Sequence, residues 1–135
     1  MRVVLDTNVL VSAFVFIGGP PEDVLRLATL GRLQLITSTP LLAELGRLLG
    51  AKFGWESART EAAISQLLGF AEVVEPGESV DDVKEDPSDN RVLEAALAGD
   101  AEVIVSGDHH LLDLQIWRGV RVQDPAAFLS RKEFE

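Results

Sequence analysis

Short apolar runs alternate along this chain with longer segments in which apolar residues recur at helical spacing. A run of four or so apolar residues is typical of a buried strand, whereas apolar residues three and four apart are typical of a helix that covers a strand. The pattern predicts strands at residues 2–5, 33–36, 73–74, 102–105 and 120–122, and helices at 8–16, 21–30, 39–50, 57–70, 89–98 and 109–114, with a last short helix from Pro125.

Helix starts and ends carry their own signals. Gly18-Gly19-Pro20 ends the first helix, and Ser38 or Thr39 before Pro40 is a strong helix start. Residues 75–88, rich in Glu, Asp, Gly, Ser and Pro, are predicted to be a loop. Ser88 or Asp89 is then expected to cap the next helix.

Strands that alternate with helices predict a parallel sheet with helices on both faces, a three-layer α/β/α fold. The 135 residues fit a single domain over 1–135. In such sheets, functional sites form beyond the carboxyl ends of the strands. The residues that directly follow each strand are therefore the first candidates for function.

Composition narrows the class of protein. Hydrophobic residues make up 47% of the chain and charged residues 25%, which is typical of a packed core. No stretch approaches the roughly 18 apolar residues of a membrane helix. The first residues do not resemble a secretion signal, because an acidic residue, Asp6, interrupts the apolar run after only a few residues. The absence of cysteine excludes disulfides and thiolate metal sites. We expect a cytoplasmic protein.

The net charge of −10 changes the picture of possible partners. Proteins that bind nucleic acid through their surface are usually basic, so a general polyanion binder is excluded. If this chain binds nucleic acid, divalent cations held by carboxylates are the obvious means of neutralising phosphates. On charge alone, the favoured interpretation is that the excess of acid only keeps the protein in solution.

Four acids stand at positions where a site is expected. Asp6 and Asp108 follow strands, and Asp89 begins a helix. Glu44 lies about one turn into its helix, beside an apolar stripe of leucines, where a charge is costly unless it is paired or bound to metal. Each acid also has an ordinary alternative, as a helix cap, a turn residue or a solvated side chain.

Carboxylates that converge repel one another, and a hard divalent cation removes that penalty. Mg²⁺ and Mn²⁺ prefer carboxylate and water oxygens, while zinc would find few ligands besides His109 and His110. Such ions activate water and stabilise charge on phosphate, so the set of acids suggests phosphodiester hydrolysis.

Four sequence motifs, taken together in their order and spacing, make this chain similar to a known family. The chain resembles PIN-domain nucleases, closest to the VapC-like ribonucleases that are toxin components of bacterial and archaeal toxin–antitoxin systems. The motifs are Val3-Val4-Leu5-Asp6-Thr7-Asn8-Val9-Leu10, Ser38-Thr39-Pro40-Leu41-Leu42-Ala43-Glu44-Leu45, Asp86-Pro87-Ser88-Asp89-Asn90-Arg91-Val92-Leu93-Glu94-Ala95-Ala96 and Ala101-Glu102-Val103-Ile104-Val105-Ser106-Gly107-Asp108.

The resemblance implies a PIN-like fold and a Mg²⁺- or Mn²⁺-dependent endoribonuclease. Its metal-binding and catalytic acids would be Asp6, Glu44, Asp89 and Asp108. Asn8 and Ser106 resemble groups that orient those carboxylates. An RNA substrate, a cognate antitoxin protein and a homodimer are the implied partners, and the apolar segment 10–17 is a candidate for the dimer contact, with core burial as the alternative.

Other residues keep two interpretations. Asp86 is a turn residue before Pro87 or a fifth acid near the metal, and the turn is favoured. Arg47 and Arg91 are phosphate contacts or surface charges. His109-His110 are favoured as the solvated start of a short helix, and Trp55 and Trp117 as packed side chains.

Two further classes of function compete with the nuclease. One is a catalytically silent PIN-fold module that binds RNA or protein, which the presence of all four acids disfavours. The other is a phosphotransfer domain. A haloacid-dehalogenase-like phosphatase needs a second Asp where Asn8 stands, and no receiver-type acidic pair or phosphate loop is evident. Cleavage of single-stranded DNA stays open.

Overall fold

The computed structural model describes residues 1–134 of the chain. Helices and strands alternate along most of it, as the hydrophobic pattern predicts. The elements are β1 (Arg2–Leu5), α1 (Thr7–Val15), α2 (Pro20–Thr29), β2 (Gln34–Ser38), α3 (Thr39–Phe53), α4 (Ser57–Leu68), β3 (Ala71–Val74), α5 (Asp89–Ala98), β4 (Val103–Val105), α6 (His109–Leu112), β5 (Ile116–Trp117), β6 (Val120–Gln123), α7 (Pro125–Leu129) and a 3-10 turn at Lys132–Phe134.

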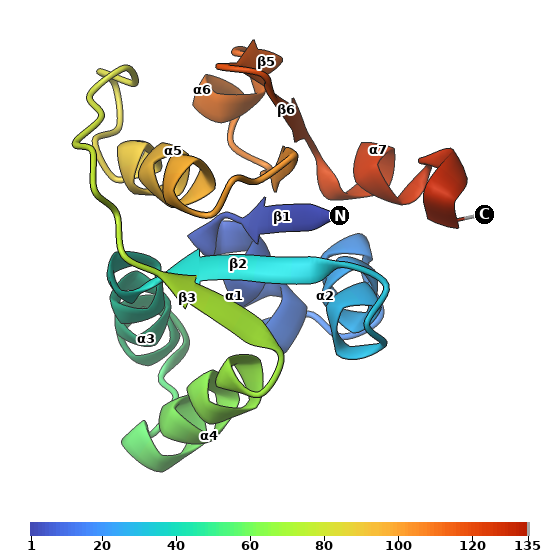
Figure 1. Ribbon diagram of the computed structural model, residues 1–135. Coiled ribbons are helices and arrows are strands. Elements are labelled where there is room, and N and C mark those ends of the chain that lie inside the picture. The colour runs from blue at the N-terminus through green and yellow to red at the C-terminus, as the bar shows by residue number, and fades with distance from the viewer. Residues whose placement is uncertain (135) are drawn as a thin grey trace.

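The strands form one sheet in the order β3-β2-β1-β4-β6-β5. β1 lies near its centre, and Val4 is in register with Ile36 of β2 and Ile104 of β4. Every pairing is parallel except that of β5 with β6. The carboxyl ends of β1, β2 and β4 therefore meet at one edge of the sheet, which lies at the left in Figure 1.

Alternate side chains of the central strands feed two separate cores. Val3 and Leu5 point into a cluster shared with α1, α2, α3, α4 and α7, while Val4 points to the other face. There it packs with residues of α5, α6 and β5. Figure 1 shows α5 on one side of the strands and α3 and α4 on the other. The three-layer α/β/α prediction is confirmed.

Several element bounds differ from the sequence prediction. α3 continues past Gly50 to Phe53, because Gly54 and not Gly50 takes the left-handed conformation that ends a helix, with φ of 68°. The short antiparallel strand β5 was not predicted, since two residues, Ile116 and Trp117, carry no periodicity. It makes the edge of an otherwise parallel sheet antiparallel.

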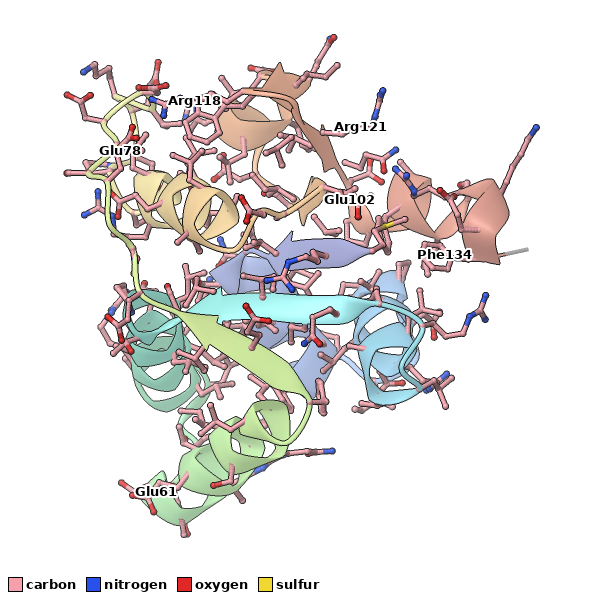
Figure 2. The ribbon with its side chains drawn as sticks, viewed as in Figure 1. Glu61, Glu78, Glu102, Arg118, Arg121 and Phe134 are labelled. Atoms are coloured by element: carbon pink, nitrogen blue, oxygen red, sulfur yellow. The ribbon has the colours of Figure 1, made fainter. Side chains whose placement is uncertain are left out.

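The connection from β3 to α5 is irregular but fastened at several points. Val80 donates its N–H to Glu94 at 2.8 Å, and Asn90 both accepts from and donates to the backbone of Val83, each at 2.8 Å. At its outer side Trp117 donates its indole N–H to Asp82 at 2.7 Å. Figure 2 shows Arg118 and Glu78 facing each other, where they form an ion pair of 2.7 Å. The loop that leads to Asp89 is thus held against α5 and β5.

Within residues 1–134, no helix combines the length and apolar character that crossing a membrane requires.

Candidate metal centre

The junction of β1 and β4 holds a chain of polar groups. Asp6 is buried and caps α1, with Oδ1 accepting the backbone N–H of Val9 at 2.8 Å. Its other oxygen accepts the hydroxyl of Ser106, which is fully buried. Ser106 Oγ in turn accepts the backbone N–H of Asp108 at 2.9 Å. This chain fixes the Asp6 carboxylate and the start of the segment that carries Asp108.

Asp108 is partly buried and caps α6, because its Oδ1 accepts the N–H of His110 at 2.7 Å. A carboxylate oxygen of Asp108 lies within 4.8 Å of one from Asp86 and one from Asp89. Three acids therefore converge: Asp108 after β4, Asp86 in the loop before α5, and Asp89 at the start of α5. Asp86 also closes the turn at Ser88, whose N–H and hydroxyl both donate to its Oδ1. It is both the turn residue and a member of the acidic group.

Asp89 is the least satisfied of these acids. Its side chain is 7% exposed, and its Oδ2 is buried with no hydrogen-bond partner among residues 1–134. Burial raises its pKa to about 7, helped by the negative charges of Asp108, Asp86 and Asp6. An anion so placed is destabilised unless a proton or a cation joins it.

Burial also raises the pKa of Asp6, against the lowering effect of its hydrogen bonds with Ser106 and Val9. The neighbouring charge of Asp108 adds to the rise. Two of the four predicted acids thus resist ionisation in the metal-free protein. The physical causes are desolvation and mutual repulsion, the conditions that a divalent cation relieves.

Glu44 reaches the same place from α3 but in a different electrostatic state. It is paired with Arg47 one turn along the helix, with oxygen-to-nitrogen distances of 2.6 and 3.0 Å. The guanidinium holds the pKa of Glu44 below its usual range. Glu44 therefore stays ionised, and a metal ion that uses its oxygens would take the place of Arg47.

Asp6, Glu44 and Asp89 line one small hollow of about 40 Å³, together with Thr7, Asn8, Leu41, Leu48, Ser88 and Val92. A single water needs about 10–15 Å³ of such space. The hollow therefore has room for an ion with a water or two. The structure brings all four predicted acids, and Asp86, to this edge of the sheet.

The residues that flank the acids differ in what they contact. Asn8 is exposed and lines the hollow, and Ser106 contacts Asp6 directly. Arg47 and Arg91 are held in ion pairs with Glu44 and Glu94. His109 is exposed, and Asp108, His109 and His110 also offer ligand atoms within 4.8 Å of one another.

Some residues near the acids carried no distinguishing signal in the sequence. Thr7 lines the small hollow and is buried, and Ser12 lies one turn beyond Asn8 on α1. The i, i+4 spacing from Asn8 was the only available clue to Ser12.

The donor set fits a hard divalent cation. The groups that converge are carboxylate oxygens, which Mg²⁺ and Mn²⁺ prefer. The buried Oδ2 of Asp89 is an acceptor that finds no donor within the described residues 1–134. Asp6, Glu44, Asp89 and Asp108 are the residues that would hold the ion, with Asp86 beside them.

Comparison with known proteins identifies the family of this chain. A family model described as the PIN domain matches residues 2–110, and the chain therefore belongs to the PIN-domain family. No curated protein matches it significantly.

Two solved structures share the fold at low sequence identity. VapBC2 from Rickettsia felis, bound to a DNA fragment from its promoter, is 17% identical, with a TM-score of 0.65 over 92% of this chain and 98% of that one. VapBC-1 from nontypeable Haemophilus influenzae is 22% identical, with a TM-score of 0.63 over 93% and 99%.

Proposed function

We propose that this protein is an endoribonuclease that hydrolyses RNA phosphodiester bonds with Mg²⁺ or Mn²⁺, and that it is the toxin of a type II toxin–antitoxin pair in the cytoplasm. The observation that carries the metal dependence is the buried carboxylate of Asp89, whose Oδ2 has no partner in residues 1–134. The site gathers several negative carboxylates, and a divalent cation supplies the positive charge that balances them.

The residues have distinct roles in this proposal. Asp6, Glu44, Asp89 and Asp108 hold the cation, and Ser106 with the N–H of Val9 fixes the orientation of Asp6. A divalent cation bound there supplies positive charge against the phosphate and lowers the pKa of an attacking water. Without that charge, the acids repel a phosphodiester.

The toxin assignment is supported by membership of the PIN-domain family and by the fold shared with two VapBC structures. We propose a small antitoxin as the protein partner and a homodimer as the assembled toxin. Light scattering of the purified chain, with and without the product of the adjacent reading frame, tests both. A monomer that ignores that product contradicts this part of the proposal alone.

RNA cleavage tests the activity directly. We expect the wild type to cut a single-stranded RNA with Mn²⁺ or Mg²⁺ and to lose at least about 100-fold in rate as Asp6→Asn or Asp89→Asn, because each change removes a ligand charge. Asp81→Asn is the matched control: Asp81 is exposed and pairs with Lys84 at 3.0 Å. The same reaction on single-stranded DNA defines the substrate range.

Equal rates for the wild type and both site variants would contradict the nuclease proposal. RNA binding without any cleavage by the wild type would instead favour the catalytically silent module.

A further inference from the structure

A second hollow of about 370 Å³ lies beside the acids and shares residues with them. Asn8 lines both hollows, and Asp108 forms part of both the larger hollow and the acidic group. We call it the lateral hollow. Its walls are Asn8, Val9, Ser12, Pro21, Gly107, Asp108, His109 and Pro125.

The charge of the lateral hollow excludes a phosphate as its occupant. None of its lining residues is Lys or Arg, and one of them, Asp108, is an acid. Phosphate groups are held by cationic side chains, by metal ions or by clustered backbone N–H groups. A neutral group with polar edges is the kind of ligand that these walls accept.

The remaining walls suit a flat heteroaromatic ring. Val9, Pro21 and Pro125 offer apolar surface, and the exposed imidazole of His109 offers a ring face on which a base can stack. Asn8 and Ser12 lie one helical turn apart on α1, and each can donate and accept hydrogen bonds. Such groups can read the edge of a nucleobase.

The lateral hollow is continuous with the acids, which favours the nucleoside beside the cut as its occupant. If the scissile phosphate lies at Asp6, Asp89 and Asp108, a neighbouring nucleoside that leaves across Asn8 or Asp108 enters the lateral hollow directly. The lateral hollow begins at both residues. Clefts that enclose small ligands measure about 300–1,000 Å³, so this one has the volume for one base and part of its ribose.

We propose that the lateral hollow binds the nucleobase of a nucleotide adjoining the scissile phosphate, and that Ser12 helps to select that base. This inference rests on the proposed ribonuclease function. It adds a specificity-determining residue that lies on α1, outside the four acidic motifs.

Binding of nucleosides tests the hollow without any cleavage. Adenosine, cytidine, guanosine and uridine are each titrated into ¹⁵N-labelled wild type in the absence of metal. We expect amide shifts confined to Ser12, His109 and their neighbours, with one base favoured. Ser12→Leu fills the hollow and should weaken that binding by about tenfold or more, a loss that matches a blocked contact. Ser65→Leu is the matched control, because Ser65 is exposed on α4.

Cleavage of a randomised RNA library provides the second readout. We expect Ser12→Ala to change the base preference at one position beside the cut, and Ser12→Leu to lower kcat/KM by about tenfold or more. Both variants should keep the wild-type rise in melting temperature with Mn²⁺, which shows that the acids are intact.

An unchanged cleavage pattern in both Ser12 variants, or nucleoside shifts away from the lateral hollow, would overturn the inference and leave the nuclease standing. A wild type that cuts no RNA would overturn the proposed function, and the nucleoside titration would then decide separately whether the hollow binds a base.

Discussion

Asp89 shows how one residue can set the proton balance of a site. Its pKa of about 7 in the folded chain lies above the ordinary value of 3.8, chiefly because it is buried. The folded state therefore binds more protons than the unfolded state between about pH 4 and pH 7. The contribution of Asp89 to stability is present below pH 4 and is lost as the pH rises through this window.

We predict that Asp89→Asn stabilises the metal-free protein at pH 7.5 by about 1–4 kcal/mol, because the amide carries no charge to bury. At pH 4 the variant and the wild type should differ little. Urea denaturation at both pH values, in the presence of chelator, measures the effect. An Asp89→Asn protein that is less stable than wild type at pH 7.5 would contradict the electrostatic account of this residue.

The other acids of the site differ in how far the sequence could predict their positions and contacts. Asp6 and Asp108 could be predicted because Asp6 directly follows an apolar strand, Asp108 comes three residues after the end of another, and parallel strands end at one edge. Asp86 has the favoured role of a turn residue, through its contact with Ser88, and it also lies close to Asp108. The contact with Ser88 is local in sequence and could be predicted, whereas the approach to Asp108 depends on the fold. The Glu44–Arg47 pair was equally out of reach, because i, i+3 spacing permits such a pair without requiring it.

At the scale of elements, the loop between β3 and α5 decides where two of the acids stand. Asp82 accepts the indole N–H of Trp117, and Glu78 pairs with Arg118, so the β5–β6 hairpin supports the loop from outside. Asp86 and Asp89 follow within a few residues. The hairpin therefore acts on the acids only through the position of the loop.

We predict that Asp82→Ala weakens Mn²⁺ binding by about threefold to tenfold, since losing one hydrogen bond of about 1 kcal/mol loosens the segment that carries Asp86. Asp82→Asn keeps an acceptor for Trp117 and should restore most of the affinity. Asp81→Ala removes the same charge from a neighbouring exposed position and is the control. Isothermal titration with Mn²⁺ measures all three, and equal losses in Asp81→Ala and Asp82→Ala would show a pure charge effect.

The positions of helices and strands were easier to predict than the contacts that hold the loop between β3 and α5. The strands β1, β2 and β4 and the helices α1 and α5 follow from periodicity, because each is long or apolar enough to carry a pattern. β5 could not be predicted, since its two residues pair with β6 only after the chain has turned at Gly119, where φ is 83°. The length of α3 depended on which of two glycines adopts a positive φ.

The whole molecule carries a net charge of −10, with acids gathered at one edge of its sheet. A cation that binds only the folded state stabilises that state by mass action. This holds whether or not the protein cuts RNA.

We predict that Mn²⁺ or Mg²⁺ raises the melting temperature by roughly 3–6 °C when the free ion is at ten times its Kd, and that chelator reverses the rise. At one fixed ion concentration the shift should be larger at pH 8 than at pH 6, because Asp89 must lose its proton to bind the ion. Asp6→Asn should abolish the shift, and NaCl at matched ionic strength should not reproduce it. Differential scanning calorimetry checks this, and a flat response in wild type and variant alike contradicts the metal pocket.

The pairing of β1 with β4 has a consequence for the order of synthesis. Asp6 is synthesised about a hundred residues before Ser106, which follows β4 and holds the Asp6 carboxylate in place, and Asp108 comes two residues after Ser106. While β4 is still inside the ribosome, a nascent chain has neither Ser106 nor Asp108 in place beside Asp6. For a protein proposed to cut RNA, this late closure postpones activity until residues 103–108 have left the ribosome.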